Sequence, residues 1–188
     1  MTGVRGTAAH FGRERVNHSY HMSGKTDTRA KVYEILKDFS TAMFVTRDSD
    51  GRPGARPMHV ARVDEEAGQV WFLTGESGAL IEEIRKEATV LLTFQKDNSA
   101  YLSLRGLAQI EHEMARIKEL WKEPYKVWFP NGPEDAEIAL VAVVLLDAEY
   151  WDNRGRNKLE YLFKAATAYV KGDKPAMGDA EQHAKTSL

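Results

Sequence analysis

TAMFVTRDSDGRPGARPMH, residues 41–59, has the pattern of two β-strands joined by a tight turn. An apolar run near its start predicts a buried strand over residues 41–47. The DSDG turn that follows ends on Gly51, which can adopt the positive φ that such turns favour. The chain then returns through residues 54–63, where Pro57 lacks the N–H of a ladder hydrogen bond. Pro57 therefore indicates a sheet edge, a bulge or a kink in the second strand.

Short strands and helices alternate after this hairpin, and one helix precedes it. The spacing of apolar residues predicts further strands at 69–74, 89–95, 100–111 and 138–151 and helices at 27–39, 79–87, 114–122 and 157–170. We expect Asp27 to cap the first helix and Pro124 to stop the third. Because short turns force neighbouring strands to be antiparallel, the pattern predicts about six antiparallel strands. Such a mainly β chain with peripheral helices is typical of a closed or split β-barrel.

The length of 188 residues suits a single domain with terminal extensions. Residues 1–25 are polar, basic and punctuated by glycine, and we expect them to be a disordered leader. A metal-binding tail built on their three histidines is the alternative interpretation, although no spacing places two of them on one helix face. The folded domain is expected over residues 26–172, and residues 173–188 are expected to be a flexible C-terminal tail.

The composition argues against several classes of function. The formal net charge is -2, so no global attraction to nucleic acid is expected. The chain has no cysteine, which removes disulfides, thiolate nucleophiles and the metal sites that need Cys. No apolar run reaches the roughly 18–20 residues of a membrane-spanning helix, and neither standard nucleotide-binding loop is present. We therefore expect a cytoplasmic protein that binds a small molecule and acts on no membrane and no nucleic acid.

One group of residues offers an anion site. Ser77 stands where the N-cap of the second helix is expected, and a helix N-terminus presents unpaired N–H groups to a phosphate. Arg56 on the second strand can add a guanidinium to the same phosphate. Taken singly, Ser77 is most simply a helix cap, and Arg56 is most simply a solvated or salt-bridged residue. Glu82 and Glu83 are interpreted as a solvated face of the same helix. His59 is interpreted first as a surface histidine, and contact with a substrate is the alternative.

The order of several short motifs along the chain is more specific than any one of them. The motifs are Met43–Arg47, Asp50–Gly51, Arg56–Met58, Trp71–Thr74, Ser77, Trp121, Trp128–Gly132 and Glu149–Asp152. Together they resemble the general stress proteins of the pyridoxamine-phosphate-oxidase-like superfamily. The resemblance extends over about residues 27–172.

This resemblance implies a split β-barrel homodimer with flavin mononucleotide (FMN) bound at the subunit interface. It implies that Arg56 and Ser77 hold the FMN phosphate. It also implies that two strands flank the flavin ring and the ribityl chain, and that a loop closes over the ring from the other subunit. The strand residues are Pro57, Met58, Phe72, Leu73 and Thr74, and the loop residues are Trp128 and Phe129.

Two departures from the family pattern narrow the expected function. Gly78 stands where such proteins commonly carry Lys after the phosphate-site Ser, and Arg85 or Lys86 is the expected compensating cation. The arginine-rich strand of true pyridoxamine-phosphate oxidases is not matched by residues 101–106, and their C-terminal His-Asp-Arg segment is missing after Trp151. The chain is therefore not expected to oxidise vitamin B6.

We expect an FMN-binding general stress protein that acts as a flavin-dependent redox protein on an unknown substrate. Because no residue qualifies as an obligatory acid or base, a non-catalytic flavin-binding sensor or interaction protein is the alternative. A third hypothesis is the same barrel holding a deazaflavin or haem. His59 and His112 are the candidate haem ligands inside the predicted fold.

Overall fold

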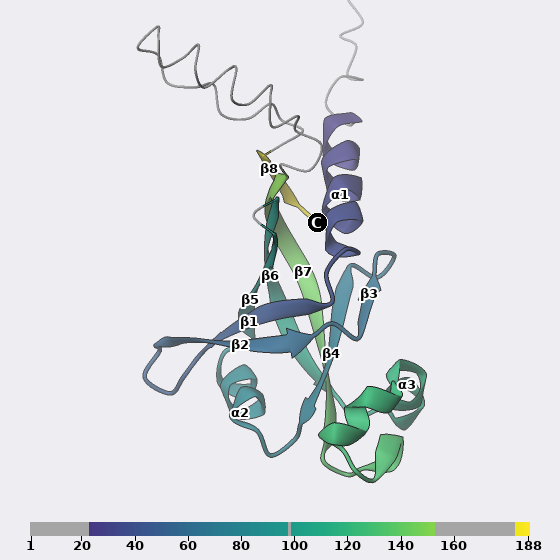
Figure 1. The fold of residues 1–188 in the computed structure, drawn as a ribbon. Helices are drawn as coiled ribbons and strands as arrows, with labels where there is room; N and C mark the ends of the chain where they lie inside the picture. Colours follow the sequence, from purple (N-terminus) through teal and green to yellow (C-terminus); the bar gives the residue numbers. More distant parts are fainter. Residues whose placement is uncertain (1–22, 98, 153–182) are drawn as a thin grey trace, which may run out of the picture.

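A computed structural model describes residues 23–97, 99–152 and 183–188 (Figure 1). The helix expected over residues 157–170 lies outside the described residues, as does most of the expected leader. Eight strands lie in the described part: β1 (Thr41–Arg47), β2 (Pro53–His59), β3 (Arg62–Asp64), β4 (Gln69–Gly75), β5 (Thr89–Lys96), β6 (Ala100–Glu111), β7 (Ile138–Asp152) and β8 (His183–Ser187). They form one sheet in the order β2-β1-β5-β6-β7-β4-β3, and β8 pairs with β7.

The sheet curls because its two edges are joined directly. β2 and β3 stand at opposite ends of the strand order, yet only Val60 and Ala61 separate them in the chain. The N–H of Val60 donates to Ser40 and that of Ala61 donates to Trp71, both at 2.8 Å. The expected single strand over residues 54–63 is therefore two strands. All pairings are antiparallel, and the expected split β-barrel is confirmed.

Pro57 lies on β2, which is the edge strand next to β1 and pairs Pro57 with Met43. Its missing N–H therefore weakens no central ladder, and the edge interpretation is confirmed. The turn before β2 contains Gly51 at a φ of 78°. The first hairpin thus follows the expectation from sequence closely.

The main core fills the inside of the curled sheet. Alternate residues of β1 point inward, and Phe44 meets Phe72 of β4 edge-on with ring centroids 5.2 Å apart. Helix α1 (Ser23–Leu36) packs against β6, β7 and β8 at one end, and helix α2 (Ala79–Lys86) adds Leu80, Ile81 and Ile84. Helix α1 begins at Ser23, so the expectation that Asp27 is its N-cap is wrong.

A second apolar cluster covers the outer face of β4 and β7. Helix α3 (Met114–Leu120) and the 3-10 helices η2 (Glu123–Val127) and η3 (Gly132–Glu134) pack there. Trp71 is 2% exposed in this cluster, and the Arg116 guanidinium lies over its ring at 4.7 Å. Both faces of β7 are thus buried along its first half, which explains its continuous apolar run. Helix α3 ends at Leu120, before the expected end at residue 122, because the chain is already extended at Trp121.

Strands β6 and β7 lose register beside Gly106. Arg105 pairs with Asp147, but Gly106 pairs with Leu145, which leaves Leu146 as the extra residue of a β-bulge. A Cβ at Gly106 would lie 2.5 Å from Cγ1 of Val143 and 2.6 Å from the carbonyl oxygen of Val144. The close approach of the two strands therefore requires glycine here.

The chain returns to the sheet after residue 182. Strand β8 pairs with the C-terminal half of β7, and Thr186 is only 9% exposed. Residues 183–187 therefore do not belong to a flexible tail, which corrects the expectation for that part of residues 173–188. Across the described ranges, no helix is both long and apolar enough to cross a membrane.

Candidate functional site

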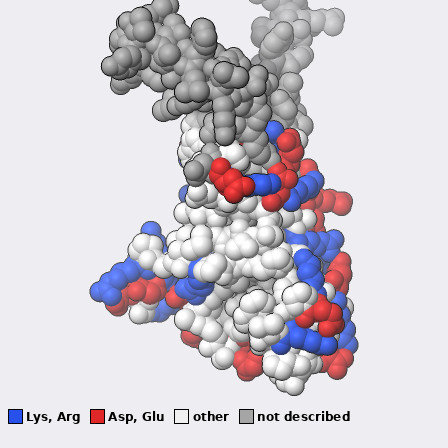
Figure 2. All heavy atoms as spheres, viewed as in Figure 1, with Lys and Arg blue, Asp and Glu red and all other residues white. Residues whose placement is uncertain are grey.

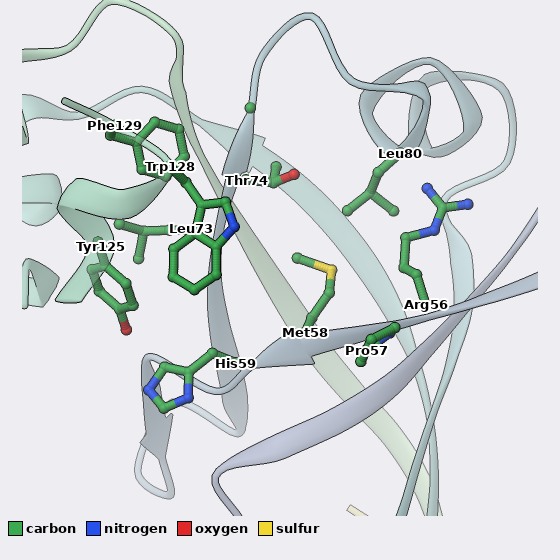
Figure 3. A pocket seen from close by; sticks show the side chains of 11 residues that line it. Arg56, Pro57, Met58, His59, Leu73, Thr74, Leu80, Tyr125, Trp128 and Phe129 are labelled. Carbon is green, nitrogen blue, oxygen red and sulfur yellow. The ribbon is translucent and has the colours of Figure 1, made fainter.

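A pocket of about 460 Å³ lies between the end of β2, the end of β4, the start of α2 and the η2 segment (Figure 3). This volume is within the range of small-molecule sites in proteins. The lining residues are Arg56, Pro57, Met58, His59, Leu73, Thr74, Gly75, Leu80, Tyr125, Trp128 and Phe129. These residues come from four separate parts of the chain, which the curled sheet brings together.

The pocket walls are mostly apolar, and one wall is an aromatic turn. Trp128 is 68% exposed at the mouth, and Figure 3 shows its indole on the opposite side of the pocket from Met58. The N–H groups of Trp128 and Phe129 both donate to the carbonyl of Tyr125 at 3.0 Å, which fixes the backbone of this turn. Exposure of an indole normally costs free energy in water, so its place at the pocket mouth suits contact with a flat apolar ligand.

Arg56 forms the polar end of the pocket, and its guanidinium contacts two other side chains. Its Nη2 donates to Oε2 of Glu83 at 2.5 Å and to the Thr46 hydroxyl at 3.2 Å. The Thr46 hydroxyl donates to the same Glu83 oxygen at 2.5 Å. The Glu83 side chain is 16% exposed. The interpretation of Glu83 as a solvated residue is therefore wrong, because it ties α2 to β1 and β2.

Ser77 does not act as the cap of α2. The N-cap residue is Gly78, and no side chain caps the helix. Ser77 is exposed and does not line the pocket. The reason is the turn before the helix, in which the N–H of Gly78 donates to the carbonyl of Gly75 at 3.1 Å.

The expected compensation by Arg85 is also not found in the pocket. Arg85 pairs with Glu76 at 2.5 Å and with Glu82 at 3.1 Å. His112 bonds the other oxygen of Glu76 at 2.7 Å, and together with Arg85 it lowers the pKa of Glu76. Arg85 thus belongs to a surface ion-pair cluster with Glu76, Glu82 and His112, none of which lines the pocket. Among the lining residues, Arg56 is the only Lys or Arg.

His59 and Tyr125 form the other polar corner of the pocket. The centroids of their rings lie 5.8 Å apart, with the rings at 63°, and the Trp121 ring also lies 5.8 Å from that of Tyr125. Desolvation and the Lys122 charge lower the pKa of His59, opposed by a hydrogen bond from its ring to the backbone of Ser40. Burial raises the pKa of Tyr125. Both side chains are therefore neutral near pH 7.

The structure brings together seven of the nine residues expected from sequence at a cofactor site. Phe72 is the first exception, because it is fully buried in the main core. Ser77 is the second, as described above. Trp128 and Phe129 line the pocket of the same chain as Arg56.

Four lining residues are not among these nine: His59, Gly75, Leu80 and Tyr125. Alternation along β2 places His59 opposite Met58, but His59 is the last residue of that strand. Leu80 reads as a core residue of α2, and it is indeed 3% exposed. The aromatic-rich segment near Trp128 is the one signal in the sequence that points to Tyr125.

The chemistry of the pocket suits a flat, largely apolar ring system with an anionic end. The walls offer apolar and aromatic contacts, and Arg56 offers the guanidinium. In the described ranges, no group of three or more His, Asp or Glu side chains could hold a metal ion.

Comparison with known proteins gives a consistent picture. The family model described as "Pyridoxamine 5'-phosphate oxidase like" matches residues 27–176. No curated protein sequence matches the chain. The general stress FMN/FAD binding protein of Xanthomonas citri is 25% identical, with a TM-score of 0.59, over 70% of this chain and 92% of that chain.

Two further solved structures share the fold. General stress protein 26 of Bacillus anthracis is 20% identical, with a TM-score of 0.59, over 65% of this chain and 92% of that chain. A protein related to general stress protein 26, from Clostridium acetobutylicum, is 23% identical, with a TM-score of 0.60, over 67% of this chain and 89% of that chain. At these identities the likeness concerns the fold alone.

Proposed function

Because the chain belongs to the pyridoxamine 5'-phosphate oxidase-like family, we propose that it is a flavin-binding general stress protein whose pocket holds FMN. The observation that carries the proposal is the pocket itself, which joins an apolar aromatic slot to one guanidinium. The name of the Xanthomonas citri protein, a general stress FMN/FAD binding protein, supports the same ligand class.

The proposed placement of the ligand follows from the walls. The flavin ring lies between Met58 on one side and Trp128 on the other, where aromatic and sulfur contacts favour a planar ring. The phosphate lies toward Arg56. The two hydrogen bonds of Arg56 described above both use Nη2, so Nε and Nη1 are the groups proposed to contact the phosphate. A bound flavin supplies hydride transfer, and the chain supplies orientation and exclusion of water.

The visible spectrum of the purified protein tests this proposal. We expect a yellow protein, or one that takes up added FMN at micromolar concentration. Arg56→Ala should weaken FMN binding by about tenfold or more, since the phosphate then meets the Glu83 carboxylate with no guanidinium between them. Ser77→Ala should leave FMN affinity unchanged, because Ser77 lies outside the pocket. A protein that binds neither FMN nor riboflavin at these concentrations would contradict the proposal.

We propose redox turnover as the finer function, on a small-molecule substrate that the pocket does not identify. His59 is the candidate to accept a proton from a bound substrate, since it lines the pocket and is neutral near pH 7. The alternative is a flavin-binding sensor without turnover, favoured by the absence of any carboxylate among the lining residues. Oxidation of NAD(P)H well above the rate of free FMN supports turnover, and its absence with several reductants supports the sensor.

We also propose that the protein works in the cytoplasm as a homodimer with the flavin near the interface. Met43 is 41% exposed and Leu91 is 37% exposed on the outer face of β1 and β5. Figure 2 shows a broad area without charged residues over β1. Pro57, which pairs with Met43, lines the pocket, so this face continues to the pocket wall. Exposed apolar area of this kind is typical of a subunit interface.

A further inference from the structure

The side chains of Arg56, Glu83 and Thr46 form a hydrogen-bonded triad and not an isolated surface ion pair. Thr46 is 2% exposed, and its hydroxyl and the Arg56 guanidinium converge on the same Glu83 oxygen. Glu83 stands three residues after Leu80, so both side chains lie on the same face of α2. Leu80 lines the pocket. The Glu83 carboxylate is therefore held directly behind the pocket wall at the end marked by Arg56.

This arrangement has an electrostatic consequence for any anion in the pocket. A phosphate that approaches Arg56 meets a guanidinium whose positive charge already faces a carboxylate at 2.5 Å. It must share the guanidinium with Glu83 or displace Glu83, and the two anions repel each other. No other Lys or Arg among the lining residues offsets this cost. An uncharged ligand tail meets no such cost.

We propose that Glu83 sets the ligand specificity of the pocket by competing with the flavin phosphate for Arg56. The inference rests on the proposed flavin function. Its consequence is that the wild-type pocket separates FMN from riboflavin only weakly, because the ring contacts are common to both and the phosphate contact is offset. Glu83 is thus a specificity-determining residue that acts through Arg56.

The competing interpretation is that Glu83 only ties α2 to the sheet. Loss of a structural tie would change the affinities for FMN and riboflavin by the same factor, because it would disturb the shared pocket. Competition for Arg56 instead changes the FMN affinity alone. The ratio of the two affinities therefore separates the two interpretations.

The experiment compares FMN and riboflavin binding to the purified full chain and to Glu83→Gln by flavin fluorescence titration. Gln keeps the shape of Glu and removes its charge. We expect the FMN-to-riboflavin affinity ratio to rise by about tenfold in Glu83→Gln, as one charge-assisted contact is freed for the phosphate. The matched control is Glu82→Gln, which changes a neighbouring carboxylate that pairs with Arg85 and is 75% exposed. It should leave the ratio unchanged.

A second variant, Glu83→Ala, guards against a misfolded Glu83→Gln and should raise the ratio in the same way. If wild type binds riboflavin but the ratio is unchanged in both variants, the role of Glu83 is overturned and the flavin function stands. If neither flavin binds wild type or either variant, both proposals are overturned. A rise in the ratio that disappears when Arg56→Ala is added supports the competition directly.

Discussion

At the scale of single residues, Gly106 and His59 contribute to stability through different physical effects. Gly106 is fixed by steric contact, because the backbone of β7 occupies the place of its missing side chain. The pKa of His59 is lowered by desolvation and by the Lys122 charge at the pocket edge. Each therefore gives a prediction that one substitution can test.

Replacing Gly106 with Ala should destabilise the fold by about 2 kcal/mol or more, since overpacking against backbone cannot be relieved by a rotamer change. The measurement is urea unfolding followed by circular dichroism. Gly75→Ala is the matched control, because nothing lies within 4 Å of a Cβ at that position. Equal midpoints for Gly106→Ala and wild type would show that β6 and β7 do not approach as closely as described.

His59 should make the folded state less stable in mild acid. Desolvation and the Lys122 charge lower its pKa below 6.5, so the unfolded chain binds the proton first as the pH falls. The stability that neutral His59 provides is present above pH 6.5 and is lost as the pH drops through the folded-state pKa. We expect the melting temperature of His59→Gln to fall less than that of wild type when the pH is lowered from 7.5 to 5. Parallel pH profiles would contradict the assignment to His59.

At the scale of elements, the sequence predicts the strands that a local pattern of apolar residues and turns marks, and not the contacts between residues far apart in the chain. The bounds of β1 and β6 agree with the expectation because alternating apolar residues and clear turns mark both strands. Strand β8 was missed because its residues HAKTS carry no apolar alternation, and only pairing with β7 makes them a strand. The sequence gives no sign of the ion pair of Glu83 for a similar reason. Its partners Arg56 and Thr46 lie far away in the chain, and helix periodicity alone does not reveal them.

Trp128, which directly follows η2, should matter for binding and not for stability. Trp128 is 68% exposed, so Trp128→Ala should change the free energy of unfolding by less than about 0.5 kcal/mol. Loss of its ring contact should weaken FMN binding by about tenfold. The control is Val127→Ala, since Val127 is 78% exposed in the same segment and does not line the pocket. Equal FMN affinities for the two variants would rule out contact between Trp128 and the flavin.

Removal of β8 should weaken the sheet. A chain ending at Gln182 loses the pairing with β7 and the packing of Ala184 and Leu188 against the main core. We expect a loss of about 1–3 kcal/mol in the free energy of unfolding, measured in urea. The exposed substitution Lys185→Ala should have little effect, because its side chain leaves the strand pairing intact. An unchanged midpoint in the truncated chain would show that β8 adds nothing to the fold.

At the scale of the whole molecule, the proposed dimer depends on the outer face of β1 and β5. Light scattering after size-exclusion chromatography should give a dimer for wild type. Met43→Asp should shift the protein toward monomer and weaken FMN binding, because it places a charge in an apolar interface. Met114→Asp is the matched control, since Met114 is 43% exposed at the start of α3. A wild-type monomer at micromolar concentration would contradict the dimer.

The strand order also governs how the chain can fold. β5 pairs with β6, its neighbour in sequence, so that hairpin can form early. β4 must wait for β7, which follows β5, β6 and α3. Until β7 arrives, the apolar outer face around Trp71 has no cover, and the β3–β4 hairpin has no partner on its open side. We therefore expect slow refolding, on the order of milliseconds to seconds, with aggregation during that interval as the main competing reaction.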